Sequence, residues 1–396
     1  MTVLQRIEYA LLCLALMALP LSWNVCLWVM AALAIVAVVR AVVEKSYSRV
    51  PVLNRWVGAG LIALVGWYAA SLLWTANMEF GIREVLGKGY LAVGGMVLIL
   101  GDFHYLNRER TDRIFSLFTI ELSLIALESW VVECNKVLSS TGGTAHFYWM
   151  HHTYMAMYVM LGYVWVMNKL RCKTDWMLVL EALLLCALMV GINSKAGLLC
   201  MGVVTVLFII LGLVKKNMKW CGVVFVLGIC TIAGTYLAHP MQHNHKEKVS
   251  VWLGDDTTGN NPFETWENSG NSLMRVNPII GAGAGDYLDE LAVGYAENGQ
   301  MENILRGYNS HNTYLDTTLA TGVIGLIILV CVICGGFVMA LNRKDMVMTM
   351  ALVVIFSTMM LESILERQMG CLFFSWVLMM CAATSGQRFK QSVFES

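Results

Sequence analysis

A histidine stands at the junction between a long polar segment and an apolar one. Residues 306–315 read RGYNSHNTYL, with His311 near the centre, and an apolar run over residues 321–341 follows closely. An imidazole has an ordinary pKa of about 6.5, so it is available at neutral pH to accept a proton from an attacking hydroxyl group. At the mouth of a membrane helix, such a group can meet both water and a lipid-borne substrate. The alternatives are a helix-capping histidine and a structural one.

The composition places this histidine in a membrane protein. Of the 396 residues, 58% are hydrophobic and only 14% are charged, which is more apolar surface than a soluble core of this size needs. Windows of about 19 residues separate apolar runs near 8–22, 25–42, 57–74, 86–101, 114–133, 153–168, 176–193, 196–214, 220–238, 313–341, 346–361 and 369–384. The sequence therefore predicts an all-α, polytopic transmembrane bundle of about twelve spans.

Lysine and arginine are unevenly shared between the loops. One set of alternate loops holds Arg6, Arg40, Lys45, Arg49, Arg55, Arg108, Arg110, Arg113, Lys169, Arg171, Lys173, Lys215, Lys216, Lys219, Arg343, Lys344, Arg388 and Lys390. The opposite short loops hold only Arg83, Lys88, Lys136, Lys195 and Arg367. Short basic loops stay in the cytoplasm, so we predict cytoplasmic termini and a His311 on the opposite face. The net charge of zero hides this asymmetry and gives no indication of nucleic-acid binding.

The hydropathy pattern divides the chain into three parts. A transmembrane block of about nine spans (1–238) precedes a polar segment (239–311), and a block of about three spans with a short tail (312–396) ends the chain. The polar segment is long for a connector and has its own apolar residues, so we expect short amphipathic helices on the outer membrane face. Within it, residues 277–285 break the chain with proline and glycine, and residues 286–291 read as a helix start rich in carboxylates.

Several short motifs follow one another along the chain. They are HHTYMAMY (151–158), NSKAG (193–197), NPIIGAGAGDY (277–287), SHNTYL (310–315), TGVIG (321–325) and ESILERQ (362–368). Their order and spacing resemble the O-antigen ligase and polymerase superfamily of bacterial envelope glycosyltransferases over about residues 140–375, whereas the first spans match only in hydropathy. The resemblance implies a GT-C-like enzyme of the inner membrane that transfers a glycan from undecaprenyl pyrophosphate, with inversion, to an acceptor hydroxyl.

The pyrophosphate leaving group that the resemblance implies needs fixed positive charge. Lys195 lies in a short turn between two spans, where the family usually has arginine; lysine keeps the charge but loses the bidentate fork. A lysine that snorkels from a helix end is the alternative. The family's second arginine has no plain counterpart ahead of Trp266, so Arg275 and Arg306 are the first candidates, with ordinary solvated cations as their alternative.

Other side chains could orient the substrate. His151 and His152 precede a span in which Tyr154 and Tyr158 are four residues apart and share a helix face. Together with Asn312 and Tyr314, the histidines and Tyr154 are candidates for contacts with the sugar or the lipid phosphate. A membrane-interface aromatic belt is the alternative for the two tyrosines of the span.

Secondary candidates are charged residues at the outer ends of spans. Glu362 and Glu366 are four residues apart and would share a helical face beside Arg367. Ionisable groups at this depth are functional candidates, although a salt-bridge network that braces the last outer loop is the alternative. Arg83 and Lys88 border the fourth span, where they could meet a lipid phosphate or anchor the helix end.

A metal site was considered for three histidines of the polar segment, His239, His243 and His245. No Asp, Glu or Cys completes a recognisable ligand pattern there, so a solvated loop is favoured. The glycine-rich residues 281–285 lack the preceding strand of a nucleotide-binding loop. The resemblance likewise implies chemistry without metal, and we expect no cofactor.

The sequence thus favours an O-antigen-ligase-like glycosyltransferase with His311 as base. Its expected partners are a glycan donor linked to undecaprenyl pyrophosphate, membrane lipid and an acceptor hydroxyl, with lipid A-core favoured. The active site would face the periplasm. Polymerisation of repeat units and protein O-glycosylation are alternatives within the superfamily. A glycolipid flippase or other transporter is the alternative of another class, although such proteins often have two related halves and this chain has a nine-plus-three arrangement.

Overall fold

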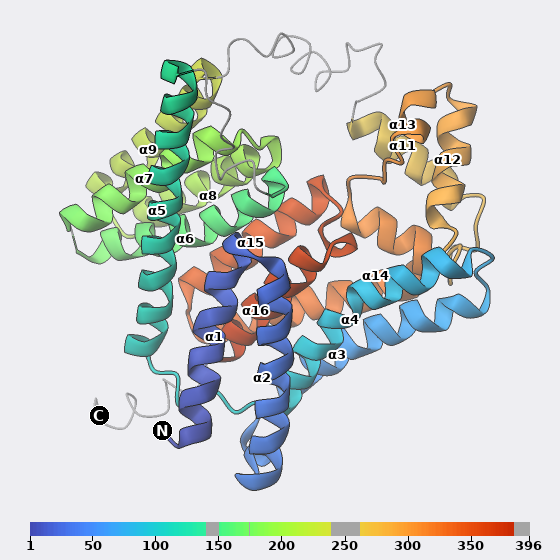
Figure 1. The fold of residues 1–396 in the computed structure, drawn as a ribbon, viewed down its shortest axis with the longest axis horizontal. Helices are drawn as coiled ribbons and strands as arrows, with labels where there is room; N and C mark the ends of the chain where they lie inside the picture. The colour runs from blue at the N-terminus through green and yellow to red at the C-terminus, as the bar shows by residue number, and fades with distance from the viewer. Residues whose placement is uncertain (140–149, 174, 239–261, 384–396) are drawn as a thin grey trace.

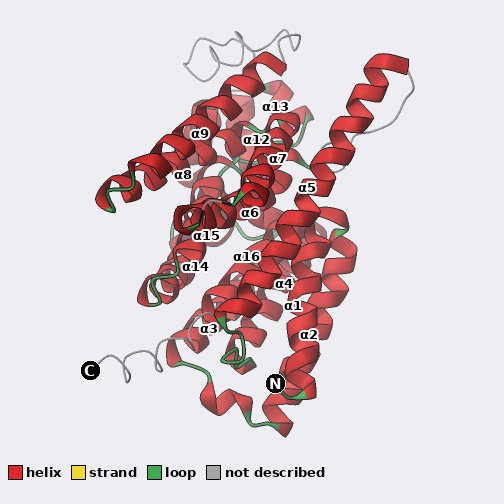
Figure 2. Ribbon diagram, turned by 90° about the vertical axis from the view of Figure 1, so that its left-hand side faces the viewer, coloured by secondary structure: helices red, strands yellow, loops and turns green. Residues whose placement is uncertain are grey.

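The computed structural model describes residues 1–139, 150–173, 175–238 and 262–383 (Figure 1). Its regular elements within these ranges are all helices, as the prediction of an all-α fold requires (Figure 2). His239, His243 and His245 of the polar segment lie outside the described residues.

Each apolar run of the sequence coincides with a helix. These helices are α1 (Val3–Leu21), α2 (Trp23–Val43), α3 (Val52–Ala70), α4 (Met78–Leu100), α5 (Arg108–Ser139), α6 (His152–Cys172), α7 (Trp176–Ile192), α8 (Lys195–Val214), α9 (Met218–Ala238), α14 (Thr313–Asn342), α15 (Met346–Leu361) and α16 (Gln368–Ala383). Within the described ranges, seven helices are long and apolar enough to cross a membrane, and three shorter ones are equally apolar. The protein is therefore a helical membrane protein, and its span number of about twelve stays a prediction.

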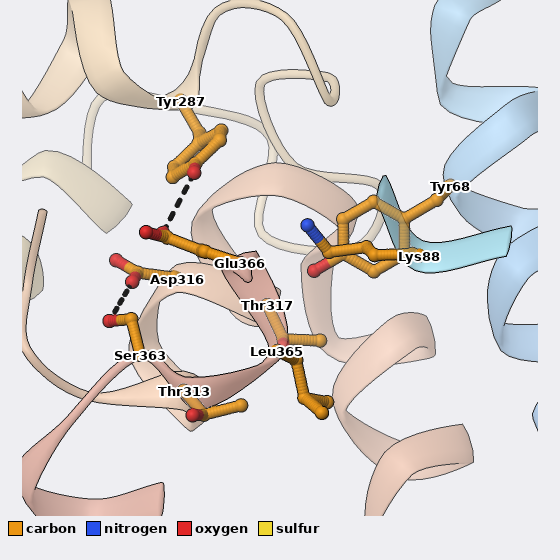
Figure 3. Close-up of a pocket in the computed structure, with 9 residues that line it drawn as sticks. All are labelled: Tyr68, Lys88, Tyr287, Thr313, Asp316, Thr317, Ser363, Leu365 and Glu366. Atoms are coloured by element: carbon orange, nitrogen blue, oxygen red, sulfur yellow. Dashed lines mark hydrogen bonds between the residues drawn. The ribbon is translucent and has the colours of Figure 1, made fainter. Parts of the chain in front are cut away.

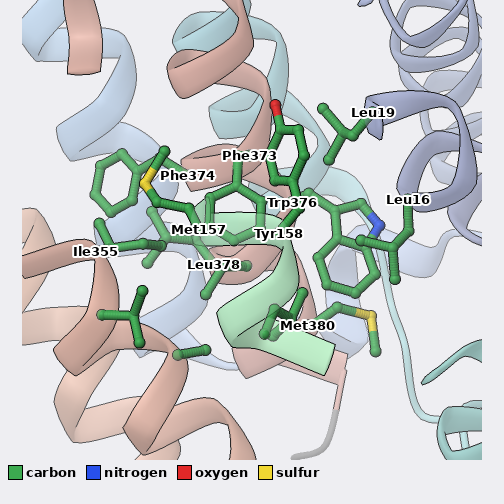
Figure 4. Packing of buried hydrophobic residues seen from close by; sticks show 14 of the residues in the cluster. Leu16, Leu19, Met157, Tyr158, Ile355, Phe373, Phe374, Trp376, Leu378 and Met380 are labelled. Carbon is green, nitrogen blue, oxygen red and sulfur yellow. The ribbon is translucent and has the colours of Figure 1, made fainter. Parts of the chain in front are cut away.

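Two helices, α6 and α16, lie at the centre of the bundle. A helix that is apolar on all sides must be enclosed by others, and every residue of α16 from Gly370 to Ala383 is buried. Figure 4 shows Phe373 and Trp376 of α16 among side chains of α1, α6 and α15. Inside lipid, such contacts stabilise mainly through close packing, because lipid tails are as apolar as the side chains. The central pair separates α1–α4 from α7–α9.

The basic loops gather at one end of the bundle. Arg49, in the short 3₁₀ helix η1 (Ser46–Arg49) after α2, pairs with Asp102 after α4 at 2.6 Å. Lys169 near the end of α6 pairs with Asp112 near the start of α5 at 2.5 Å. These contacts bring together loops that the sequence places on one side. The prediction that this side is cytoplasmic follows from the charge rule alone.

Three short helices occur in the described part of the polar segment: α11 (Pro262–Leu273), α12 (Tyr287–Glu297) and α13 (Met301–Leu305). The predicted helix start is confirmed, because α12 begins at Tyr287 with Asp289 and Glu290 in its first turn. Figure 1 shows these helices at the end of the bundle where α3 and α4 join. The carboxylate of Asp286 holds them there by accepting two hydrogen bonds from backbone amides of the α3–α4 connection, both at 2.7 Å.

The helix that follows His311 is interrupted. Within α14, Gly322 has a left-handed backbone (φ 68°, ψ −171°), which breaks the helical hydrogen-bond ladder. The glycine-rich segment before α12 fills the gap: Ala282 N donates to Leu319 O at 2.7 Å, and Val323 N donates to Pro278 O at 2.9 Å. Irregular backbone at this depth is stable only when such bonds satisfy it. A side chain at Gly322 would collide with this segment, because its Cβ would lie 2.1 Å from a backbone oxygen.

Candidate active site at the His311 corner

His311 lies at a corner of the backbone between α13 and α14. Its own backbone is left-handed (φ 50°), which is uncommon for a residue with a side chain. Asn312 is the residue that caps α14, since its Oδ1 accepts hydrogen bonds from the backbone amides of Tyr314 at 3.0 Å and Leu315 at 3.1 Å. The helix-cap interpretation of His311 is therefore wrong. The imidazole, with its side chain 38% exposed, makes other contacts.

The contact that defines the site joins His311 to Glu362. The imidazole Nδ1 lies 3.2 Å from Oε2 of Glu362, which follows the last residue of α15. Thr153, at the start of α6, donates to the other carboxylate oxygen at 3.2 Å. Burial by itself lowers the pKa of His311, but the hydrogen bond and negative charge of Glu362 outweigh it and raise that pKa. Burial conversely raises the pKa of Glu362, and the hydrogen bond from His311 with the nearby histidine charges lowers it.

Two further histidines flank Glu362. The rings of His151 and His152 stack with centroids 4.3 Å apart, and the His151 ring lies 5.8 Å from that of Tyr154. Burial and the neighbouring charge of His152 lower the pKa of His151. Exposed Arg367 contributes in the same direction, so it lies within electrostatic reach. The predicted His151, His152 and Arg367 thus gather on one side of Glu362. Within the described ranges, no group of three or more His, Cys, Asp or Glu is arranged to hold a metal ion.

Lys195 is the first residue of α8 and is exposed. A Cβ on Gly197 would lie 2.5 Å from the Cβ of Ala156, which places the start of α8 against the start of α6. One turn further, the Cys200 thiol lies 3.4 Å from the hydroxyl of Thr358, one turn before the end of α15. Lys195 therefore lies at the same end of the bundle as the His311 corner. The positive end of a helix dipole and a lysine both favour a bound anion.

The two loop arginines are engaged by neighbouring side chains. Arg275 pairs with Glu297 at 2.5 Å, within the α11–α13 unit. Arg306 pairs with a glutamate one turn earlier and donates to the hydroxyl of Tyr308 at 3.0 Å. The Tyr308 ring lies edge-on to the His311 ring, with centroids 5.5 Å apart. Of the two loop arginines among the predicted phosphate ligands, only Arg306 is thus linked to the histidine, through Tyr308.

The tyrosines of α6 do not form an interface belt. Tyr154 and Tyr158 are 4% and 0% exposed, so the aromatic-belt interpretation is wrong. Tyr158 packs against Phe373 at a centroid distance of 5.1 Å, and the two rings lie side by side in Figure 4. Tyr314 donates to the backbone oxygen of Phe356 at 3.3 Å. These contacts give Tyr154, Tyr158 and Tyr314 packing roles, and substrate orientation by Tyr154 or Tyr314 stays a prediction.

Lys88 lies inside α4 and not at the border of the fourth span, where the sequence placed it. Because α4 begins at Met78, Lys88 is well inside the helix, and its side chain is only 4% exposed. It pairs with Glu84, and its ammonium lies 4.7 Å from the centre of the Tyr68 ring. The prediction that Lys88 borders the span is wrong. Its neighbour Arg83 is exposed and pairs with a glutamate of the same helix.

A polar cavity lies beneath the His311 corner (Figure 3). It has a volume of about 10 Å³, room for about one water molecule, and its lining residues are Tyr68, Lys88, Tyr287, Thr313, Asp316, Thr317, Ser363, Leu365 and Glu366. Tyr287 donates to Glu366 at 2.7 Å, and Ser363 donates to Asp316. The sequence pointed to Glu366 and Lys88 but missed Asp316 and Tyr287. The signal for Asp316 was present, because it is the one carboxylate in the apolar run 313–341.

Glu362 and Glu366 do not share a helical face. The helix α15 ends at Leu361, and the short 3₁₀ helix η4 (Ile364–Glu366) follows. The two carboxylates consequently contact different partners, His311 and Tyr287. The predicted i, i+4 arrangement is therefore wrong.

Comparison with known proteins supports the resemblance seen in the motifs. A family model described as O-antigen ligase matches residues 180–330. The matched part runs from α7 past the break in α14, so it contains both Lys195 and His311. A search of curated proteins finds no match.

Proposed function

Because residues 180–330 place the chain in the O-antigen ligase superfamily, we propose that it transfers a glycan from undecaprenyl pyrophosphate to an acceptor hydroxyl. The favoured acceptor is lipid A-core, which makes the protein an enzyme of lipopolysaccharide synthesis. The observation that carries the proposal is the pair of His311 and Glu362, with Nδ1 and Oε2 3.2 Å apart. A partly exposed imidazole that a carboxylate orients is the arrangement of a general base.

His311 is the base in the proposed reaction. With Nδ1–H donating to Glu362, the lone pair of Nε2 is available for the acceptor. The acceptor hydroxyl gives its proton to Nε2 while its oxygen attacks C1 of the donor sugar. The bond between C1 and the pyrophosphate oxygen breaks with inversion, and undecaprenyl pyrophosphate leaves. The Glu362 carboxylate stabilises the imidazolium that forms.

The leaving pyrophosphate is assigned to polar and positively charged groups at the His311 end of the bundle. Lys195 at the start of α8 and exposed Arg367 are the first candidates, with His151 and His152 at the start of α6. Two helix starts contribute backbone amides to the same region, which further favours negative charge. Arg275 ranks below these residues because a carboxylate already neutralises it.

The membrane setting completes the proposal. The basic end of the bundle is assigned to the cytoplasm, so the His311 corner opens to the periplasm, where a lipid-linked donor can reach it laterally. The energy of transfer comes from the activated donor, and the reaction requires neither nucleotide nor metal.

A reconstitution assay tests the function. Purified protein is mixed with an undecaprenyl-pyrophosphate-linked glycan and lipid A-core, without nucleotide and with a chelator. Wild-type protein is expected to form the ligated product, and His311→Ala to lose about 10²- to 10⁴-fold in rate. Glu109→Gln, which removes an exposed carboxylate at the basic end, is the matched control and is expected to act as wild type. Lipid translocation that survives His311→Ala, without product, would contradict the proposal and favour a flippase. Products with lengthened donor chains would favour a polymerase.

Two substitutions test the assigned cation. Lys195→Arg is expected to retain activity because it keeps the positive charge, and Lys195→Ala to lose about 10- to 100-fold as the leaving group loses stabilisation. The measurement is kcat/KM for the donor. Equal rates in the two variants would remove Lys195 from the mechanism.

A further inference from the structure

Three successive backbone amides at the His311 corner are held by side chains. Ser310 N donates to Asp316 Oδ1 at 3.1 Å, and His311 N donates to Asn309 Oδ1 at 3.0 Å. Asn312 N donates to Ser363 Oγ at 3.1 Å. The helical ladder of α14 starts only beyond these residues, so these bonds replace it at the corner.

The side chains that hold these amides lead to two carboxyl groups. Asn309 Nδ2 donates to Glu366, and Ser363 Oγ donates to Asp316. The corner therefore rests on Asp316 of α14 and on Glu366 at the end of η4. Tyr287 adds a link to α12, because its hydroxyl donates to Glu366 at 2.7 Å.

Figure 3 shows the carboxyl groups of Asp316 and Glu366 beside each other, an arrangement that a shared proton would stabilise. Burial, the charge of Asp316 and a hydrogen bond between the two groups raise the pKa of Glu366 well above its ordinary range. Lys88 of α4 acts in the opposite direction, Glu84 of the same helix adds to the rise, and Tyr68 lines the cavity beside them. The protonated form of Glu366, which can donate to Asp316, is thereby favoured.

We propose that Asp316 and Glu366 form one positioning clamp, which holds the left-handed His311 corner so that the imidazole faces Glu362. The effect of the clamp on catalysis rests on the proposed function, whereas the geometry of the corner does not depend on it. Neither carboxyl group acts on substrate. Tyr287 makes the clamp dependent on the docking of α12, so the extramembrane helices help to align the base.

Substitutions at the clamp separate positioning from catalysis. Glu366→Leu removes the acceptor for Asn309 and Tyr287, and kcat is expected to fall about 100-fold, as for a displaced base, with little change in KM. Asp316→Asn keeps an acceptor for Ser310 N, and its amide Nδ2 can replace the shared proton as the donor between the two groups, so it is expected to retain most of the activity. Tyr287→Phe removes one hydroxyl beside an intact ring and is expected to lower kcat about 3- to 10-fold. Glu109→Gln is again the matched control.

A second measurement does not depend on transfer. The pKa of His311 is followed by NMR in protein with ¹³C-labelled histidine, and its signal is assigned by comparison with His311→Asn. In Glu366→Leu, the pKa is expected to fall toward the ordinary imidazole value, because the ring no longer faces Glu362. An unchanged pKa with unchanged kcat in Glu366→Leu and Tyr287→Phe would overturn the clamp. A shifted pKa in a protein that transfers no glycan would support the clamp and refute the proposed function.

Discussion

Glu362 and Glu366 are two glutamates only four residues apart, yet their surroundings shift their pKa values in opposite directions. Glu362 is 22% exposed and surrounded by histidines, which lower its pKa, so it is a carboxylate that can orient His311. Burial and Asp316 raise the pKa of Glu366, which favours its protonated form, and through Asn309 this group supports the backbone of His311. The difference teaches that environment, and not spacing, assigns the roles of neighbouring carboxyl groups.

The turn between the two residues produces this difference. Because α15 ends at Leu361 and η4 is a tight 3₁₀ turn, the chain reverses between Glu362 and Glu366. Thr313 joins the turn to α14, since its hydroxyl donates to Glu362 O at 2.8 Å and accepts from Ile364 N at 3.0 Å. The two carboxyl groups thereby contact different partners, His311 for Glu362 and Tyr287 for Glu366.

Among tests of the difference between Glu362 and Glu366, removal of the negative charge of Glu362 is expected to have the largest effect. Glu362→Gln is expected to reduce kcat about 100-fold, because a neutral amide stabilises an imidazolium poorly. In the His311→Ala background the same change is expected to have no further effect, since the two residues act as a unit. The measurement is kcat from steady-state kinetics of the wild type, the two single variants and the double variant. Additive losses would show that Glu362 acts apart from His311.

A second test uses the pH profile. Glu362 raises the pKa of His311, so the acid limb of kcat/KM in the wild type is expected above the ordinary imidazole pKa of about 6.5. Neutral imidazole is the active form, and activity therefore rises as pH rises through this limb. In Glu362→Gln the limb is expected to move to lower pH, whereas Glu109→Gln leaves it in place. A limb that stays fixed would separate the two residues.

A smaller effect is expected at the hydroxyl that supports Glu362. Thr153 donates to Oε1 of this carboxylate at 3.2 Å, so Thr153→Val removes one hydrogen bond and little volume. The rate is expected to fall about 3- to 10-fold. Thr153→Ser, which keeps the hydroxyl, is the matched control and should retain the wild-type rate. Equal losses in both variants would point to packing instead.

The smallest effect concerns stability, where the two glutamates should act with opposite sign. The lowered pKa of Glu362 stabilises the fold above the unfolded pKa of about 4.3, and this contribution is lost as pH falls through the folded value. The pKa of Glu366 is raised, so its effect on stability has the opposite pH dependence. Its contribution to the free energy of unfolding is present at low pH and is lost as pH rises above about 4.3. In thermal unfolding scans in detergent, Glu362→Gln should flatten the acid side and Glu366→Gln the alkaline side. The same slope change in both variants would contradict the comparison.

The fold was predictable because an apolar run must be long enough to cross a bilayer. The same rule failed at Lys88, since α4 extends to Met78 through residues whose charges pair within the helix, and hydropathy does not register that extension. His311 was predictable from its position between two kinds of segment. The pairing of Glu366 with Asp316 was not, because it depends on how η4 and α12 dock on α14, and no local pattern encodes that docking.

The interruption at Gly322 has a consequence for how the enzyme sits in different membranes. Residues 277–285 are fastened by backbone hydrogen bonds to both sides of the break, at Leu319 and Ala320 before it and at Val323 and Ile324 after it, and the helix then continues to Asn342. A change in bilayer thickness is commonly absorbed by tilting of a span. The anchored segment ends at Ile324, so we expect tilting of the portion beyond it to disturb the His311 corner less than tilting of an unbroken helix would.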